Sequence, residues 1–400
     1  MDVREATHRL RRLRLAKLGA FLAGKTAFLT GGSVRDTLLG FPVRELDIAV
    51  FAEAEALAQE LASRLGGTWF PLGRKPLLTY RVVAGAVKVD LWPIPGTLED
   101  DIRRRDFTVN ALFFRLPSGP LLDLVGGLAD LASGRLEVIR PENIHDDPLR
   151  VLRGLRLSLT RPLSLTETSA ALLKRAAPEL VRVAPERLRE ETGKILDQSQ
   201  LALAWKRGLA LGVWHALGVV EANVPADPAP TLERLEVLRR TRGTWSRSAC
   251  DVLWLALAAA RLAAGQAPDA AVSASLAPFG FRGRELARLR TAATLAEHLR
   301  ASPNPKAVLA VEQPRQGVLA WWFARDPQVT LPRLRALWRW WVAFSQKPPL
   351  LLGDEIAEIL ELPPGPARRD AVAELRRLQA LGVLRARRAA RNYLARRWKV

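Results

Sequence analysis

The distribution of apolar and polar residues predicts a first part of the chain built from strands and helices, and a remainder built from helices. In the first part, short apolar or alternating runs between glycines and prolines are typical of strands. We expect strands at residues 27–29, 45–50, 69–72, 77–84 and 87–92. Beyond about residue 200, apolar residues recur at helical spacing only, as in residues 232–240 and 282–300. The pattern indicates an α+β chain with its strands near the N-terminus.

Two helices are expected among these strands. Residues 53–65 have helical periodicity, and the glycines that follow at 66 and 67 would end the helix. Residues 4–23 predict an N-terminal helix that exposes its arginines. Its packed residues would be Leu10, Leu13, Leu18 and Phe21.

A glycine pair after the first strand predicts a sharp corner between strand and helix. Gly31 and Gly32 are followed by Ser33, a good N-cap for a helix that ends near Gly40. Backbone N–H groups and a helix N-terminus converge at such a corner, which suits a phosphate chain. A glycine pair before a helix is also an ordinary turn, so the corner gains meaning only from its neighbours.

Acidic residues follow on two of the predicted strands. Glu45 and Asp47 alternate with apolar residues, so period-2 geometry places both carboxylates on one face. The same alternation places Asp90 on the face of its strand opposite the apolar residues, as a candidate third carboxylate. Carboxylates beside a phosphate-binding corner suit magnesium in nucleotide chemistry, although such a spacing also occurs on solvated strand faces.

Composition narrows the class of protein. The 400 residues, 48% of them hydrophobic, are enough for two to four domains with real cores. The formal net charge of +20 favours a polyanionic partner, although an arginine-rich composition alone gives the same value. Cys250 is the single cysteine, which excludes a disulfide framework and a multi-cysteine metal site. With neither a secretory signal nor an apolar run that could span a bilayer, we expect a cytoplasmic protein.

Several motifs, in a fixed order, resemble those of the tRNA nucleotidyltransferase/poly(A) polymerase family in its bacterial (class II) form. They are GGSVRDTLLG at 31–40, ELDIA at 45–49, RRDFTVNA at 104–111, DDPLR at 146–150 and PERLREETGKIL at 185–196. The family usually has Asp-x-Asp in the second motif, so Glu45 is a departure with a longer side chain. The resemblance implies an N-terminal nucleotidyltransferase (polymerase-beta-like) mixed-sheet head, followed by an all-helical neck, body and tail.

The resemblance also implies domain boundaries and residue roles. The domains would be the catalytic head at 1–137, the neck with a base-selecting template at 138–205, the body at 206–345 and the tRNA-binding tail at 346–400. Glu45, Asp47 and Asp90 would be catalytic, with Glu45 and Asp47 holding Mg²⁺. The nucleotide-binding residues would be Gly31, Gly32, Ser33, Arg35, Arg104, Arg105, Asp106, Asn110, Asp147, Arg150, Arg153 and Arg156. A further helix would brace the template through Glu186, Arg187 and Glu190.

The resemblance makes Asp147 and Arg150 the base-selecting pair. Three residues apart on a helix, they would share one face. Cytosine offers an amine donor beside a ring-nitrogen acceptor, so a carboxylate can accept while a guanidinium donates. Adenine has a similar edge, whereas uracil and guanine would leave buried groups unpaired. An intrahelical ion pair is the alternative interpretation.

Which nucleotides would be added depends on one short segment. Family members that build the whole CCA end have a longer loop before the RRDFT motif, whereas residues 91–99 contain little more than a proline turn. We therefore expect a CC-adding enzyme, which transfers cytidines from CTP to the tRNA 3′ end, releases pyrophosphate and leaves the adenosine to a separate enzyme. A full CCA-adding enzyme that also uses ATP, a poly(A) polymerase and a non-catalytic RNA-binding protein are the alternatives.

The expected macromolecular partner is tRNA, bound at its acceptor stem and TΨC arm through shape and phosphate contacts. Basic helices of the body and tail would make these contacts. In the tail they include Arg385, Arg387, Arg388, Arg391, Arg396 and Arg397.

Overall fold

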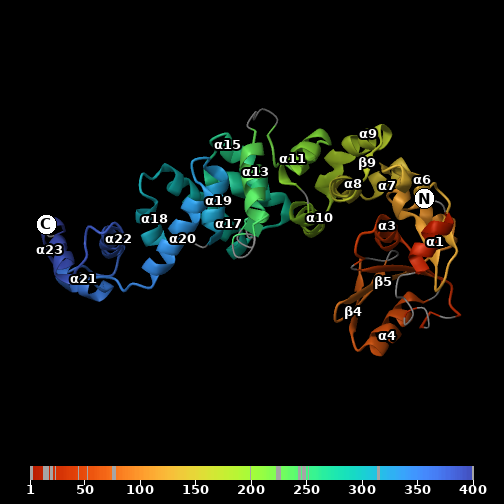
Figure 1. Cartoon of the computed structure of the whole chain (residues 1–400), viewed down its shortest axis with the longest axis horizontal. Helices are drawn as coiled ribbons and strands as arrows, with labels where there is room; N and C mark the ends of the chain where they lie inside the picture. Colours follow the sequence, from red (N-terminus) through yellow and green to blue (C-terminus); the bar gives the residue numbers. More distant parts are fainter. Residues whose placement is uncertain are drawn as a thin grey trace. The chain divides into compact units, whose positions relative to one another are not determined.

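The computed structural model describes residues 3–11, 18, 21–22, 24–43, 45–51, 53–73, 78–198, 200–221, 227–241, 245, 249–250, 252–312 and 316–398. These residues form two compact units (Figure 1). The first unit comprises residues 1–187 and 207–216, and the second comprises residues 188–206 and 217–400.

A seven-stranded mixed sheet is the core of the first unit. The mixed sheet and five of its strands are as predicted, whereas the strands at Leu112–Arg115 and Leu121–Asp123 were not predicted. Its strands, in spatial order, are β3 (Thr68–Leu72), β4 (Thr79–Ala84), β5 (Val87–Pro93), β2 (Leu46–Val50), β1 (Ala27–Leu29), β6 (Leu112–Arg115) and β7 (Leu121–Asp123). Strands β2 and β5 are parallel, and the other neighbouring pairs of this sheet are antiparallel. The parallel pair places Asp47 directly beside Asp90.

Helices of the first unit connect and cover these strands. They are α1 (Val3–Arg11), α3 (Gly31–Leu39), α4 (Ala54–Leu65), α5 (Leu98–Arg103), α6 (Gly127–Ala132), α7 (Pro141–Asp146), α8 (Leu149–Thr160), α9 (Glu167–Ala176) and α12 (Val213–Ala216), with 3-10 helices η1 (Thr108–Asn110) and η2 (Ala177–Arg182). A short parallel pair, β8 (Arg135–Leu136) and β9 (Ser164–Leu165), lies outside the large sheet. Helices α10 (Pro185–Gln198) and α11 (Leu201–Ala210) contribute residues to both units.

The N-terminal helix is confirmed over residues 3–11. Leu10, Leu18 and Phe21 are buried, as expected from their spacing. Leu13, the fourth residue of that predicted set, lies outside the described residues.

The sheet face that carries Asp47 is closed by α5. Residues two apart on a strand share a face, so Asp47 lies on the same side as Ala49. Ala49 belongs to a buried cluster that contains Ile102 of α5 and Phe113 of β6. Asp47 is therefore next to a buried, closely packed apolar region.

Helix α8 contacts other elements of the first unit in its middle and at its C-terminal end. A Cβ at Gly154 would lie 3.0 Å from Cζ of Phe107, so glycine allows a close approach there. At the C-terminal end of α8, Arg161 donates to both carboxylate oxygens of Asp36 in α3, each at 2.8 Å. Its guanidinium also lies over the Phe41 ring, 4.5 Å from the centroid. These contacts define the orientation of α8 relative to α3.

The second unit is helical throughout its described part, as predicted. Its helices are α13 (Ala229–Arg239), α15 (Leu255–Ala263), α16 (Pro268–Leu276), η3 (Ala277–Phe279), α17 (Gly283–Ala301), α18 (Pro305–Glu312), α19 (Gln316–Arg325), α20 (Leu331–Ser345), α21 (Gly353–Leu360), α22 (Pro366–Ala380) and α23 (Arg387–Arg397). Trp321 and Trp322 are buried in α19, and Ile356, Leu375 and Leu394 join the last three helices in one core. Within the described ranges, no helix combines the length and apolarity needed to cross a membrane.

The start of α6 provides a test of the packing in the first unit. Asp123 accepts hydrogen bonds from the N–H groups of Gly127 and Leu128, each at 2.9 Å. A Cβ on Gly127 would lie 2.3 Å from the carbonyl oxygen of Thr108. We therefore expect Gly127→Ala to lower the free energy of unfolding by about 1–3 kcal/mol, as overpacking usually does. Urea unfolding followed by circular dichroism measures this change.

Gly193→Ala is the matched control in a helix with room for the methyl group. Its Cβ would lie 3.6 Å from the nearest atom, Cζ2 of Trp254. Alanine has the higher helix propensity, so this variant should be unchanged or more stable by up to about 1 kcal/mol. Equal destabilisation of both variants would contradict the packing argument.

Candidate active site

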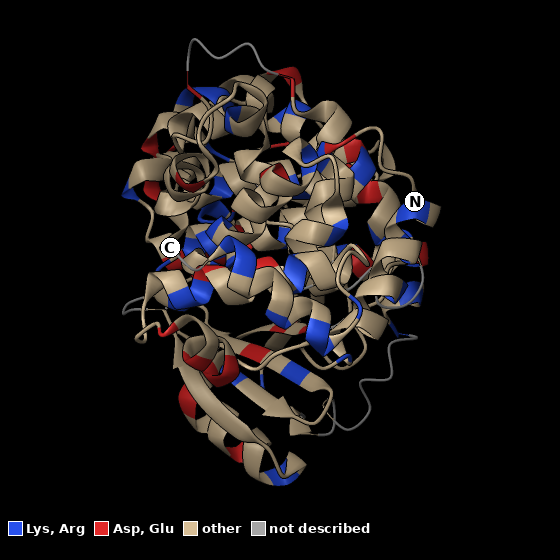
Figure 2. Ribbon diagram, turned by 90° about the vertical axis from the view of Figure 1, so that its left-hand side faces the viewer, with Lys and Arg blue, Asp and Glu red and all other residues tan. Residues whose placement is uncertain are grey.

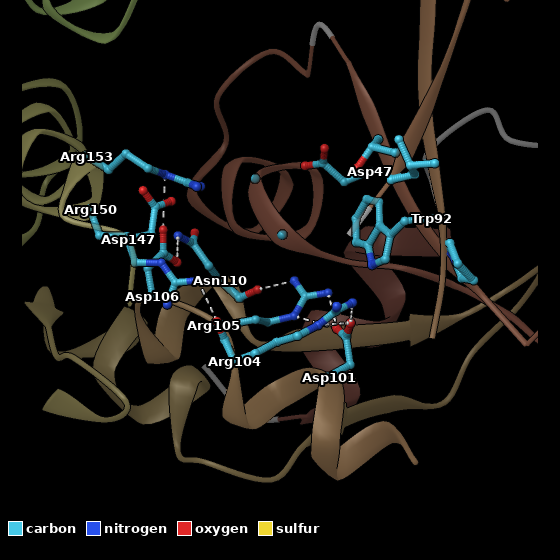
Figure 3. Close-up of a pocket in the computed structure, with 15 residues that line it drawn as sticks. Asp47, Trp92, Asp101, Arg104, Arg105, Asp106, Asn110, Asp147, Arg150 and Arg153 are labelled. Carbon is cyan, nitrogen blue, oxygen red and sulfur yellow. Dashed lines mark hydrogen bonds and ion pairs between the residues drawn. The ribbon is translucent and has the colours of Figure 1, made fainter. Parts of the chain in front are cut away.

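A polar cavity of about 420 Å³ lies in the first unit, between the sheet, the segment that follows α5 and the beginning of α8 (Figure 3). It brings together ten of the residues that the sequence indicates. The lining residues are Gly31, Gly32, Asp47, Leu78, Thr79, Trp92, Pro93, Asp101, Arg104, Arg105, Asp106, Asn110, Asp147, Arg150 and Arg153. Among the described residues, five predicted site residues are outside this lining set: Ser33, Arg35, Glu45, Asp90 and Arg156.

The glycine pair positions Asp47 against the N-terminus of α3. Gly31 has φ +62°, and a Cβ there would lie 3.0 Å from Oδ2 of Asp47. The backbone N–H of Ser33 donates to that same oxygen at 3.2 Å. The carboxylate therefore lies at the positive end of the helix, in a position that stabilises its charge.

The prediction that Ser33 is the N-cap is wrong. Helix α3 begins at Gly31, with Thr30 as its N-cap residue, and Ser33 lies inside the first turn. The Ser33 hydroxyl donates to the carbonyl oxygen of Glu45 at 2.9 Å and accepts from the N–H of Asp47 at 2.7 Å. The Ser33 hydroxyl thus joins the helix to the beginning of β2. The side-chain oxygen that accepts from an N–H of the first turn belongs to Asp47 instead.

Burial raises the pKa of Asp47, and the adjacent carboxylate of Asp90 raises it further. The hydrogen bond from Ser33 opposes this shift, as do the more distant charges of Arg105 and Arg35. The net direction is upward, so the ionised form of Asp47 is not fully compensated by the groups around it.

Glu45 and Asp90 share a basic partner, Arg81 of β4. The guanidinium donates to both oxygens of Asp90, with Nε–Oδ1 and Nη2–Oδ2 each at 2.8 Å. Its Nη2 also lies 3.2 Å from Oε2 of Glu45. Lys88 approaches the other oxygen of Glu45, Oε1, at 3.5 Å. Glu45 and Asp90 therefore belong to one charged cluster beside Asp47.

The donor set of this cluster fits a divalent cation in its chemistry. In the described part of the chain, no three His, Cys, Asp or Glu side chains are already grouped to hold a metal ion. Oxygen ligands are nevertheless those that Mg²⁺ prefers, and the half-buried carboxylate of Asp47 lies beside the buried carboxylate of Asp90. A bound cation would relieve the like-charge repulsion that raises the pKa of Asp47.

Two arginines of the RRDFT motif are held by Asp101, which is not among the site residues predicted from the sequence. Asp101 is 1% exposed, and its Oδ1 accepts from Nε of Arg104 at 2.9 Å. Its Oδ2 accepts from Nε and Nη2 of Arg105, at 2.9 and 2.7 Å. The spacings of three and four residues on a helix were a signal for these ion pairs. Arg105 also lies over the ring of Trp92, 5.6 Å from its centroid.

Asp106 and Asn110 form a buried network with α3. Asp106 Oδ1 accepts from Nδ2 of Asn110 at 2.9 Å, and Asn110 Oδ1 accepts from Nη1 of Arg35 at 2.5 Å. Burial alone would raise the pKa of Asp106, but Arg153, Asn110 and Arg150 lower it to about 2. Arg35 is also bonded to Asp36 through Nε at 2.8 Å, so its guanidinium is directed into the protein.

The predicted base-selecting pair lines the cavity, but Asp147 is not on a helix. It is the C-cap residue after α7, with φ −137° and ψ 88°, and Arg150 is in the first turn of α8. Pro148 separates the two helices because it restricts the backbone of the residue before it. The Asp147 carboxylate accepts from Nη2 of Arg187 at 2.9 Å, a contact made by the predicted bracing segment.

Arg150 has hydrogen-bonding capacity left over. Its Nη2 donates to the carbonyl oxygen of Arg104 at 2.6 Å. Its Nε and Nη1 are buried and have no hydrogen-bond partner among the described residues. Burial lowers the pKa of Arg150, while Asp106 and Asp147 oppose that shift. Buried donors of a charged group are costly to leave unpaired, so they suit a polar ligand.

The low pKa of Asp106 predicts a pH-dependent contribution to stability. Folding lowers this pKa from 3.8 to about 2, so the ionised form stabilises the fold above pH ~4, and the contribution is lost as the pH falls towards 2. Asp106→Asn should lower the free energy of unfolding by about 2 kcal/mol at pH 7, and by less at pH 3. Urea unfolding at both pH values measures the difference. Glu60→Gln, at an exposed pair on α4, is the control, and a pH-independent loss for Asp106→Asn would contradict the assignment.

Two family models match parts of this chain. Residues 27–84 and 82–137 match the family described as the poly A polymerase head domain. Residues 163–217 match a family described as the probable RNA and SrmB-binding site of polymerase A. The fold resembles that of the Thermotoga maritima CCA-adding enzyme complexed with tRNA, with a TM-score of 0.70 and 21% identity over 98% of both chains.

Sequence relatives include one that covers the chain almost completely. The chain is 31% identical to the CC-adding tRNA nucleotidyltransferase of Geobacter sulfurreducens, over 96% of this chain and 94% of the relative. It is 36% identical to an A-adding tRNA nucleotidyltransferase of Deinococcus radiodurans, over 50% of this chain and 45% of that one. The chain therefore belongs to the tRNA nucleotidyltransferase/poly(A) polymerase family in its bacterial, class II form.

Proposed function

We propose that this protein adds two cytidines from CTP to the 3′ end of tRNA and releases pyrophosphate. The observation that carries the proposal is the pairing of Arg150, with two unfilled buried donors, and Asp147 in the cavity that also holds Asp47. One cavity thus offers a base-recognising edge and an acidic residue for phosphoryl chemistry. A tRNA substrate also agrees with the cytoplasmic location expected from the sequence.

In this proposal the base is selected by hydrogen-bond polarity. The exocyclic amine of cytosine donates to Asp147, and Arg150 donates to the ring nitrogen. Arg187 orients the Asp147 carboxylate, since it donates to one of its two oxygens. Uracil would present an N–H to Arg150 and a carbonyl to Asp147, which leaves buried groups unpaired.

The triphosphate is assigned to the basic side of the cavity, where Arg104, Arg105 and Arg153 line it with the glycine pair. Asp101 holds the first two arginines in place, so their positive charges are preorganised. Asp47, with Glu45 and Asp90, would hold Mg²⁺. When bound, Mg²⁺ supplies an activated tRNA 3′-hydroxyl and neutralises charge on the departing pyrophosphate.

Cytidine addition alone, without the terminal adenosine, is supported by the connection between β5 and α5. Only residues 94–97 separate the two elements. Thr97 and Asp100 form a capping box, in which Thr97 Oγ1 accepts from the N–H of Asp100 at 3.2 Å and Asp100 Oδ2 accepts from the N–H of Thr97 at 3.0 Å. Residues 94–97 are too few to form the longer loop that, in the family, is associated with the switch from C to A addition.

Transfer-RNA binding is proposed for the basic helices. Lys and Arg positions recur along the helices in Figure 2. Arg388, Arg396 and Arg397 on α23 are exposed, as a phosphate-binding surface requires. Such contacts depend on the charge and shape of the RNA backbone and little on its sequence, so they suit a protein that binds many different tRNAs.

Full CCA addition is the second candidate, because adenine presents nearly the same edge as cytosine and an A-adding protein is among the relatives. Sequencing the products made from tRNAs that lack CCA, CA or A separates the candidates. With CTP and ATP together, we expect two cytidines on the tRNA that lacks CCA, one on the tRNA that lacks CA, none on the tRNA that lacks A, and no adenosine on any of them. A complete CCA end would establish the second candidate, and a long adenosine tail would indicate poly(A) polymerase activity.

The role of Asp47 gives a direct test of the site. Asp47→Ala should lower CTP incorporation by at least about 10²-fold, because it removes the half-buried carboxylate beside Asp90. The dissociation constant for tRNA should change by less than about twofold, since phosphate contacts on other helices dominate binding. Single-turnover incorporation and filter binding measure the two quantities. Near-normal turnover in this variant would remove Asp47 from the reaction, and exposed Glu60→Ala serves as the unaffected control.

A further inference from the structure

Arg81 occupies an unusual place relative to the acidic cluster of Glu45, Asp47 and Asp90. It lies on β4, directly opposite Asp90 of β5 in the antiparallel register. Both Asp90 oxygens accept from its guanidinium at 2.8 Å. Its Nη2 extends further and reaches Glu45, which precedes β2, the next strand beyond β5. One side chain therefore spans three neighbouring strands at the point where the carboxylates gather.

A cross-strand ion pair would explain only part of this arrangement. Opposite charges on facing residues stabilise many antiparallel sheets, and such a pair needs no further role. The contact with Glu45 goes beyond the facing pair and brings the positive charge to a second carboxylate. The side chains of Arg81 and Asp90 are only 26% and 12% exposed, so solvent screens their interaction less than it would at the surface.

The charges of the cluster also point to compensation. Three carboxylates give a formal charge of −3, and Arg81 and Lys88 bring it to −1. Without Arg81, the cluster would carry −2 with no cation bound, and like charges on adjacent strands would repel each other. When no divalent cation is bound, the Arg81 guanidinium therefore neutralises part of the negative charge that such a cation would neutralise.

We propose that Arg81 is the built-in counterion of this acidic cluster, stabilising it without metal and weakening its affinity for a free divalent cation. The inference rests on the proposed metal-dependent function and makes Arg81 a positioning residue. A cation that meets a cluster of charge −1 is bound weakly, and the phosphates of an incoming nucleotide supply the missing negative charge. Mg²⁺ sites made of one or two carboxylates plus substrate phosphates work in this way.

The test is Mn²⁺ binding to the full chain without nucleotide, measured by electron paramagnetic resonance of the free ion. Arg81→Met, which keeps much of the side-chain volume, should bind Mn²⁺ about tenfold more tightly than the wild type, since one positive charge next to the site is gone. In chelator its thermal midpoint should fall, and saturating Mn²⁺ should raise that midpoint more than in the wild type.

Two variants serve as controls. Lys88→Met removes a charge that is 3.5 Å from Glu45 and 47% exposed, so it should change Mn²⁺ affinity in the same direction but less. Arg64→Met removes an arginine that is paired with Glu60 on the exposed face of α4, and it should leave the affinity unchanged. If Arg81→Met fails to fold by circular dichroism, Arg81→Gln is measured in its place with the same expectation.

Equal or weaker Mn²⁺ binding by the Arg81 variant would overturn the proposal and make Arg81 a support for a ligand. Absence of Mn²⁺ binding in both proteins would overturn it as well. Failure of the proposed function is recognised separately, because it appears in the sequenced tRNA products of the wild type and not in the comparison of Mn²⁺ affinities.

Discussion

The contact between the Asp47 carboxylate and the N-terminus of α3 is the constraint on which the site depends. The Ser33 N–H donates to Asp47 Oδ2 at 3.2 Å, and Gly31 leaves no room for a side chain beside that oxygen. Because Asp47 is also on β2, next to Asp90 of β5, this contact fixes the glycine corner relative to the acidic strands. The dipole of α3 stabilises the negative charge of the half-buried Asp47 carboxylate. The base-recognising residues and the arginines of the cavity are positioned relative to α3, β2 and β5.

The base-recognising part is attached through arginines. Arg150 donates to the carbonyl oxygen of Arg104, and Arg153 approaches Asp106 at 3.1 Å. At the other end of the same helix, Arg161 is paired with Asp36 of α3. Ion pairs of this kind, partly shielded from water and bidentate at Arg161, hold a geometry better than exposed pairs on flexible side chains. Within the first unit, these contacts of the α8 arginines connect the base-recognising residues to the segment that carries Arg104 and Asp106 and to α3.

Local patterns in the sequence predicted the glycine corner and five of the seven strands of the large sheet, and the family resemblance supplied most of the ten predicted residues that line the cavity. These predictions failed where a side chain interacts with a residue distant in the sequence instead of a neighbouring one. Ser33 has the chemistry of an N-cap, but Asp47 supplies the capping oxygen from a different element. Asp147 was expected on a helix because of its spacing to Arg150, yet the proline between them starts a new helix. Arg81 has no local signal, since its importance arises from strand register. The expected domain boundaries at 137, 205 and 345 stay predictions.

Anchoring of α8 at both ends has a consequence for how a product could lengthen. A helix pinned by Arg150 at one end and by Arg161 at the other cannot follow a growing chain without breaking several buried bonds. Under the proposed function, the recognition edge stays where it is, and each added nucleotide must withdraw from it. The RNA terminus, by refolding within a fixed enclosure, would then provide the translocation that other polymerases obtain by sliding along a template.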